Sequence, residues 1–185
     1  MKNNDNQNFT KWVSTWGTAT SITDRKECVY AKNLTLRYPV HMVFDGDRIR
    51  LRFSNLTGSE DVSFTASVRL LCDEKARSDF VSLTKDGEKA FVIPAGTEVH
   101  SDELDFPVTS GSKLEVSIYI KDCTNMNAGT LVTGPLSGGS YAYGDFEKAP
   151  DFPPDLCRNT NWYYFLNTVV QFVLHSIKMR SCNYI

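Results

Sequence analysis

Apolar and polar side chains alternate along most of this chain, and a helical period is almost absent before residue 160. In residues 48–53, three arginines alternate with three large apolar residues: Arg48-Ile49-Arg50-Leu51-Arg52-Phe53. Such alternation places apolar side chains on one face of a β-strand and polar side chains on the other. The chain is therefore expected to fold as strands that each bury one face.

The same period recurs in several other segments. The longer ones are residues 34–44, 62–71, 90–93 and 113–120, and shorter candidates lie at 12–19, 79–83, 101–107 and 129–133. Pro39 lies within the first of these segments. Because proline has no backbone N–H to donate to a neighbouring strand, that strand is expected at a sheet edge or at a bulge. The sequence Asp45-Gly46-Asp47 predicts a tight turn that joins residues 34–44 and 48–53 in a hairpin with a basic outer face.

Strands of this length and spacing, without intervening helices, predict an antiparallel β-sandwich. About eight strands would make a double-sheet jelly roll. We therefore expect an all-β, jelly-roll-like sandwich over residues 10–160, preceded by a polar tail at 1–9 and followed by a C-terminal extension at 161–185. Glycines, prolines and acids concentrate in residues 134–155, which are expected to form an extended strap or linker.

The C-terminal extension allows two structures. Its first residues, 162–166, are apolar enough for a final strand, but Asn167, Gln171 and His175 then recur at near-helical spacing. The extension is therefore either a strand or an amphipathic helix. It is too short and too polar for a membrane span.

Composition excludes several classes of function. The 185 residues carry a formal net charge of −2 and a pI of about 5.9, which is unlike a nucleic-acid-binding domain. The polar residues 1–8 lack the apolar core of a signal peptide, which favours a cytoplasmic protein. The five cysteines are odd in number, widely spaced and expected to be free: Cys28, Cys72, Cys123, Cys157 and Cys182. No cofactor is expected.

A series of short segments stands in a distinctive order. They include Trp12-Val13-Ser14-Thr15-Trp16-Gly17-Thr18-Ala19, Leu34-Thr35-Leu36-Arg37, Gly46-Asp47-Arg48-Ile49-Arg50-Leu51-Arg52-Phe53-Ser54-Asn55, Ile93-Pro94-Ala95-Gly96-Thr97-Glu98-Val99-His100-Ser101-Asp102, Ser140-Tyr141, Gly144-Asp145-Phe146 and Asn161-Trp162-Tyr163-Tyr164-Phe165-Leu166. Together with residues 113–120, and in this order, they resemble the N-terminal β-sandwich domain of GDSL (SGNH) type esterases. The resemblance covers about residues 10–169.

The resemblance implies an accessory domain rather than an enzyme. In that family the sandwich precedes a hydrolase domain with a Gly-Asp-Ser nucleophile and a later Asp-x-x-His. Here neither motif occurs, and the positions three residues before the histidines hold Tyr38, Thr97 and Phe172. No catalytic residue can therefore be carried over, and the implied partner is an SGNH hydrolase domain. A small esterase with an unrecognised site is a weaker alternative.

The resemblance ends near residue 169, where the catalytic strand should begin. We interpret residues 161–185 as the interrupted start of a catalytic domain, caused by a truncation or a frameshift, although a natural stand-alone variant is an alternative. An interrupted domain start would lack its native partner, so self-association through the C-terminal tail is predicted.

Two surface features could bind a ligand or a partner domain. The stripe of Arg48, Arg50 and Arg52, to which Arg37 could add, suits a partner domain or an acidic glycan, or is a solvated face that protects the sheet. Trp12 and Trp16 share parity and are expected on one face, in the core or as a sugar-stacking platform. A stand-alone carbohydrate-binding module is thus the alternative function.

The turn acids do not predict a metal site. Asp45 and Asp47 lie close together, but calcium needs six to eight oxygen ligands and two carboxylates fall short of that number. No metal is therefore expected.

Overall fold

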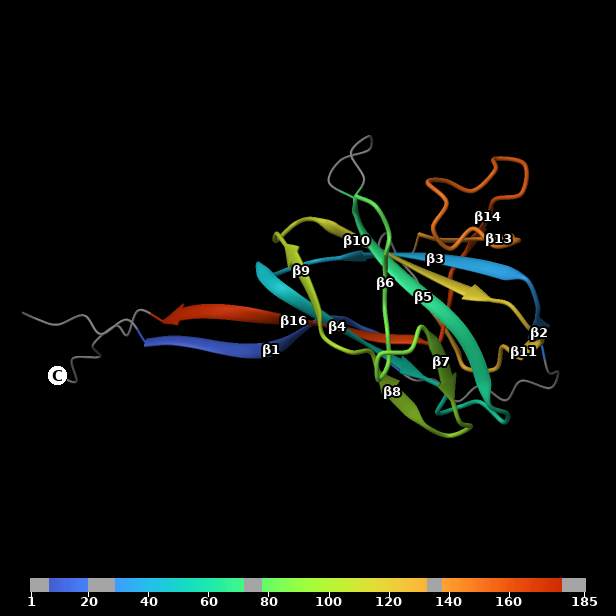
Figure 1. Ribbon diagram of the computed structural model, residues 1–185, viewed down its shortest axis with the longest axis horizontal. Helices are drawn as coiled ribbons and strands as arrows, with labels where there is room; N and C mark the ends of the chain where they lie inside the picture. The colour runs from blue at the N-terminus through green and yellow to red at the C-terminus, as the bar shows by residue number, and fades with distance from the viewer. Residues whose placement is uncertain (1–6, 20–28, 72–77, 133–137, 178–185) are drawn as a thin grey trace, which may run out of the picture.

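The computed structural model describes residues 7–19, 29–71, 78–132 and 138–177, and for 7–9 and 174–177 it describes the backbone alone. Within these ranges the chain consists of strands, turns and loops, and all strand pairings are antiparallel (Figure 1). The predicted all-β, antiparallel fold is confirmed, whereas the jelly-roll strand order stays a prediction. The described part contains no helix that could cross a membrane.

Two large sheets make up the sandwich. Sheet I has the order β1-β16-β4-β8, and β9 also pairs with β4: β1 (Gln7–Gly17), β16 (Leu166–Ile177), β4 (Gly46–Ser54), β8 (Glu98–His100) and β9 (Leu104–Val108). Sheet II has the order β14-β13-β3-β10-β5-β6, and β7 also pairs with β5: β14 (Arg158–Thr160), β13 (Gly139–Tyr143), β3 (Leu34–His41), β10 (Lys113–Ile120), β5 (Val62–Leu71), β6 (Val81–Ser82) and β7 (Ala90–Ile93). Two small pairs complete the fold: β2 (Tyr30–Ala31) with β11 (Thr124–Asn125), and β12 (Gly129–Leu131) with β15 (Trp162–Tyr164).

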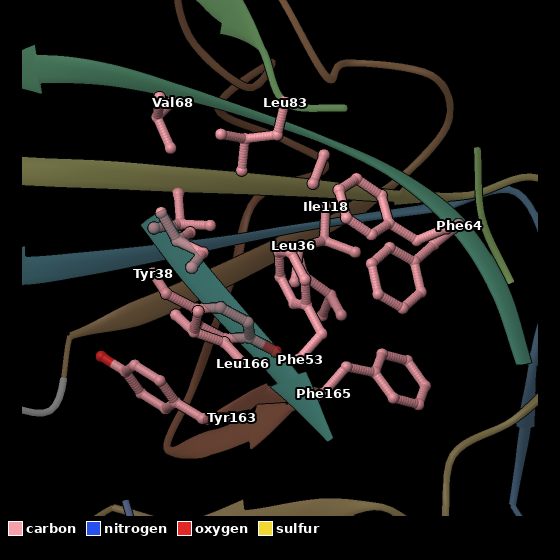
Figure 2. Close-up of a cluster of buried hydrophobic side chains, with 14 of the residues drawn as sticks. Leu36, Tyr38, Phe53, Phe64, Val68, Leu83, Ile118, Tyr163, Phe165 and Leu166 are labelled. Carbon is pink, nitrogen blue, oxygen red and sulfur yellow. The ribbon is translucent and has the colours of Figure 1, made fainter. Parts of the chain in front are cut away.

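The core lies between the two sheets. Strand β4 turns Ile49, Leu51 and Phe53 inward with no exposed surface, as the alternation predicts. The ring of Phe53 meets the Phe64 ring of sheet II edge to face, at 5.2 Å between centroids (Figure 2). Phe64 in turn stacks on Phe165 at 5.1 Å. Aromatic contacts of this kind add to the free energy of apolar burial and hold the sheets together.

The predicted hairpin between residues 34–44 and 48–53 is wrong. Strand β3 pairs with β10 and β13 in sheet II, whereas β4 pairs with β16, β8 and β9 in sheet I. The connection therefore crosses from one sheet to the other, and both strands keep their apolar faces toward the same core. Gly46 does not have a positive φ; a Cβ there would lie 2.8 Å from the backbone oxygen of Phe172, so close strand packing requires the glycine.

The predicted edge position of the strand with Pro39 is also wrong, because β3 lies between β10 and β13. Pro39 pairs with Glu115 of β10, but the pairing of β13 with β3 covers only Leu34 to Arg37. Among the described residues, Pro39 therefore has a ladder partner only on the side of β10. Its missing N–H costs no ladder hydrogen bond on the other side.

Residues beyond Leu166 form a strand, so the strand alternative holds and the helix does not. Strand β16 lies between β1 and β4 in the interior of sheet I. Gln171 is fully buried, and its Nε2 donates to the backbone oxygen of Phe44 at 2.9 Å. A spacing of four residues also falls on one face of a strand, which explains the misleading helical pattern. The interrupted-domain interpretation stays a prediction, and residues 178–185 lie outside the described residues.

Strands β1 and β16 continue beyond the rest of the sandwich as a two-stranded ribbon (Figure 1). The pairing of β16 with β4 ends at Phe172, whereas its pairing with β1 continues to Ile177, opposite Gln7. We call residues 7–11 and 173–177 the arm. Within the described residues, each edge of the arm has no further strand beside it.

We expect the chain to self-associate through this arm, because unpaired strand edges are templates for pairing with another chain. Multi-angle light scattering after size exclusion should show a mass that rises with protein concentration. Thr10, exposed in the arm on the edge strand β1, offers a test. Thr10→Lys should shift the protein toward monomer, since an edge lysine opposes strand pairing. A monomeric wild type at high concentration would contradict the expectation.

Candidate functional site

The outer face of sheet I carries the predicted arginine stripe. Arg48, Arg50 and Arg52 project from β4 on the side opposite the core, and all three are half-buried. A row of side chains crosses the sheet at Arg48, because the strand register places Trp12 opposite Phe172 and Phe172 opposite Arg48. Residues paired directly across an antiparallel ladder project to the same face, so these three side chains meet.

The row is in close contact. The Trp12 and Phe172 rings lie 5.3 Å apart between centroids, tilted by 59°. The guanidinium carbon of Arg48 lies 3.9 Å from the centroid of the Phe172 ring and 5.8 Å from that of Trp12. Arg48 Nη1 also donates to Glu103 Oε2 at 2.8 Å. Cation–π contact and ion pairing thus orient Arg48 over the aromatic pair.

Trp12 and Trp16 do not share a face, which corrects the sequence-based expectation. A β-bulge between Ser14 and Trp16 shifts the register of β1 by one residue and reverses the side-chain parity. Trp16 packs inward against the core, with its ring 5.6 Å from that of Tyr163. Only Trp12 remains on the outer face.

The other two arginines of the stripe differ in their partners. Arg52 Nε donates to Asn167 Oδ1 at 2.8 Å, and its Nη1 lies 3.5 Å from the carboxylate of Glu98. Arg50 Nε donates to the backbone oxygen of Ser101 at 3.2 Å. In the described part of the chain, no aspartate or glutamate forms an ion pair with Arg50.

His100 borders the stripe opposite Arg52 and is exposed. Partial burial lowers the pKa of His100 from its ordinary value, Arg50 and Arg52 lower it further, and Glu98 acts in the opposite direction. We expect an NMR titration to give a His100 pKa below about 6.5. In Arg50→Met the pKa should rise, because removing a neighbouring cation favours the charged imidazolium. An unchanged value would contradict this electrostatic environment.

A hollow of about 580 Å³ opens beside this row, at the base of the arm. It is lined by Thr10, Asp45, Gly46, Asp47, Pro107, Val108, Thr109 and Phe172. Phe172 belongs both to the hollow and to the aromatic row. The carboxylate of Asp47 is 74% exposed, and Asp45 Oδ1 accepts from the Ser110 amide at 2.8 Å. The hollow thus combines an aromatic wall with carboxylate oxygens.

The outer face of sheet II, by contrast, is covered. Residues 144–155 form the strap that composition predicted, although 139–143 form strand β13 and 133–137 lie outside the described residues. Arg37 is 3% exposed beneath the strap and donates to the backbone oxygens of Phe146 at 2.8 Å, Pro150 at 3.3 Å and Ala149. The proposed addition of Arg37 to the stripe is therefore wrong, because it lies on the other sheet.

Further polar side chains are enclosed beneath the strap. Ser67 Oγ donates to Glu147 at 2.6 Å, and Thr65 donates to the same carboxylate. Arg69 Nε donates to Glu115 at 2.7 Å, and its guanidinium carbon lies 4.3 Å from the centroid of the Phe80 ring. The contacts of Glu147 attach the strap to the sheet, whereas those of Arg69 join β5 to β10 and to the segment that holds Phe80.

Among the described side chains, no serine hydroxyl is hydrogen-bonded to a histidine, and no group of three or more His, Cys, Asp or Glu could hold a metal. Cys123 and Cys157 are free thiols, whereas Cys28, Cys72 and Cys182 lie outside the described residues. No family model matches this chain, and no curated protein matches it.

Proposed function

We propose that this chain is a non-catalytic accessory domain that packs beside an SGNH-type hydrolase domain, stabilises it and shapes access to its substrate cleft. The sequence resemblance motivates the proposal, and the arm is the observation that supports it. A two-stranded ribbon without further cover is marginally stable in water, so a protein partner at the arm would gain stabilising contacts.

The position of the arm suggests how the two domains would be arranged. Thr10 and Phe172 lie at the base of the arm and also line the hollow. A hydrolase domain docked on the arm would therefore stand next to the outer face of sheet I. That face, with its aromatic row and arginine stripe, would border the substrate cleft.

The first test is to sequence the coding DNA beyond the codon for Val169 and to translate all three frames. One frame should encode an apolar strand ending in Gly-Asp-Ser and a later Asp-x-x-His. The encoded hydrolase domain, produced separately, should then co-elute with this chain and melt at a higher temperature in its presence. If no frame encodes these motifs, or if the hydrolase domain is unaffected, the proposal is wrong.

We also expect the chain itself to lack esterase activity. p-Nitrophenyl acetate should not be turned over above the rate with heat-denatured protein, because the described serines have no histidine base. Turnover abolished by a serine-directed reagent would establish the third alternative, a small esterase.

A stand-alone carbohydrate-binding module is the second candidate function, and the aromatic row with its adjoining hollow favours it. Sugar rings pack their apolar faces on aromatic side chains, while their hydroxyls donate to carboxylates such as Asp45 and Asp47. Affinity gels containing a panel of polysaccharides would test it, since a domain that only packs against a protein partner should not be retarded.

A further inference from the structure

Arg50 has an unusual position in the stripe, because it is flanked by cations and has no acidic partner among the described residues. Arg48 pairs with Glu103 and Arg52 pairs with Glu98, so both outer arginines are neutralised within the protein. A guanidinium carries five N–H donors, and in the described part of the chain Arg50 uses only Nε, toward Ser101. Its two Nη groups thus have no hydrogen-bond acceptor among the described residues.

The ligand group that best suits such a guanidinium is a carboxylate. Arginine binds carboxylates through two parallel hydrogen bonds, a geometry that lysine cannot reproduce. Because Arg50 is half-buried, an ion pair there is screened less by water and salt than an exposed one. Partial burial is the main cause of the lowered pKa of His100, and Arg50 and Arg52 lower this pKa further, so His100 lies within reach of their positive charge.

The surroundings of Arg50 restrict the rest of the ligand. Asp45 and Asp47 stand on the rim of the hollow, beside the start of β4. The same carboxylates accept hydrogen bonds from hydroxyl groups. Trp12 supplies an apolar ring beside the stripe, packed against Phe172, over which the Arg48 guanidinium lies. A carboxylate, several hydroxyls and an apolar ring face together describe a uronic acid.

We propose that the outer face of sheet I binds a uronic-acid-containing oligosaccharide, with Arg50 paired to the sugar carboxylate and Trp12 packed on a sugar ring. The proposal rests on the second candidate function and names its ligand. Trp12 and Arg50 lie on strands separated by β16, about 10 Å across the sheet. The ligand is therefore an oligosaccharide of at least two rings rather than a single sugar.

The test is affinity electrophoresis of the full chain in gels that contain polygalacturonate or its fully methyl-esterified form. The two polymers share the same sugar backbone and differ in whether each carboxyl group is a free carboxylate or an uncharged methyl ester. Polygalacturonate should retard the wild type at least tenfold more strongly, and Arg50→Met should abolish that difference. Arg50→Lys should restore only part of it, because the bidentate geometry is lost. Trp12→Ala should weaken retardation by both polymers.

Arg158→Met is the matched control. Arg158 is an exposed arginine on β14 of sheet II, where it donates to backbone oxygens of Asp155 and Cys157. Its loss removes the same charge without touching sheet I, and retardation by polygalacturonate should stay unchanged. Far-ultraviolet circular dichroism of each variant shows whether it is folded, and the Lys variant preserves the charge if Arg50→Met is unstable.

The outcomes separate the proposals. If both polymers retard the wild type equally, and Arg50→Met is retarded as strongly as the wild type, the role of Arg50 is overturned. The chain would then still be a sugar-binding module. No retardation by either polymer would overturn the inference, while the panel of other polysaccharides tests the second candidate function and the hydrolase-domain experiment tests the first. Equal loss in Arg50→Met and Arg158→Met, or equal binding of polyglutamate, would show general attraction of anions and overturn the inference.

Discussion

Replacing Arg37 by methionine should lower the free energy of unfolding by about 3 kcal/mol and release the strap over sheet II. Arg37 is buried, and its guanidinium donates hydrogen bonds to three backbone oxygens within residues 146–150. Its guanidinium carbon also lies 4.4 Å from the centroid of the Phe152 ring. Methionine fills much of the same volume but leaves those oxygens without their donor, and unsatisfied buried acceptors are costly.

Two measurements check this result. Urea denaturation gives the loss of stability, and trypsin cleavage after Lys148, an exposed residue within the strap, reports on the strap itself. Cleavage there should accelerate in Arg37→Met under native conditions. Arg158→Met is again the control, because an exposed arginine that donates to backbone oxygens should change stability by less than about 0.5 kcal/mol. A destabilised variant with unchanged cleavage at Lys148 would show that Arg37 does not hold the strap.

The alternation of side chains was sufficient to predict the fold class and most of the long strands. Residues 62–71, 90–93 and 113–120 are strands with the predicted bounds. The alternation, however, shows which face of a strand is buried. It does not show which other strand lies beside that strand in the sheet. The supposed hairpin of β3 and β4 failed for this reason, since both strands satisfy the pattern equally well in separate sheets.

The candidate site was predicted in part. The three arginines of β4 lie on the outer face as the pattern indicates, but the bulge in β1 separates Trp12 from Trp16, and no residue type in that strand signals it. Phe172 was missed because its role depends on β16 lying between β1 and β4. The composition of residues 134–155 predicted an extended segment, but not that part of it covers Arg37.

Phe165 has a buried side chain and a left-handed backbone conformation, and the alternation of side chains does not predict the second of these properties. It is 2% exposed in the core and stacks on Phe64, yet its backbone has a φ of 65°. For a residue with a Cβ, this left-handed backbone conformation costs about 1–2 kcal/mol of conformational free energy. Two hydrogen bonds hold the conformation, from the Phe165 amide to Ala128 at 3.1 Å and from the Ser54 amide to Phe165 at 2.8 Å.

Phe165→Ala should therefore cost about 3–5 kcal/mol of stability through the cavity and the lost ring contacts, while Phe165→Gly should cost about 0.5–1 kcal/mol less. Glycine normally destabilises a strand relative to alanine, but here it removes the backbone strain that alanine keeps. Phe64, buried in β5 without a positive φ, is the matched position, and there the glycine variant should be the less stable one. Equilibrium urea denaturation of Phe165→Ala, Phe165→Gly, Phe64→Ala and Phe64→Gly measures these differences in stability. If glycine is less stable than alanine at both positions, the strain at Phe165 contributes nothing measurable to the stability of the fold.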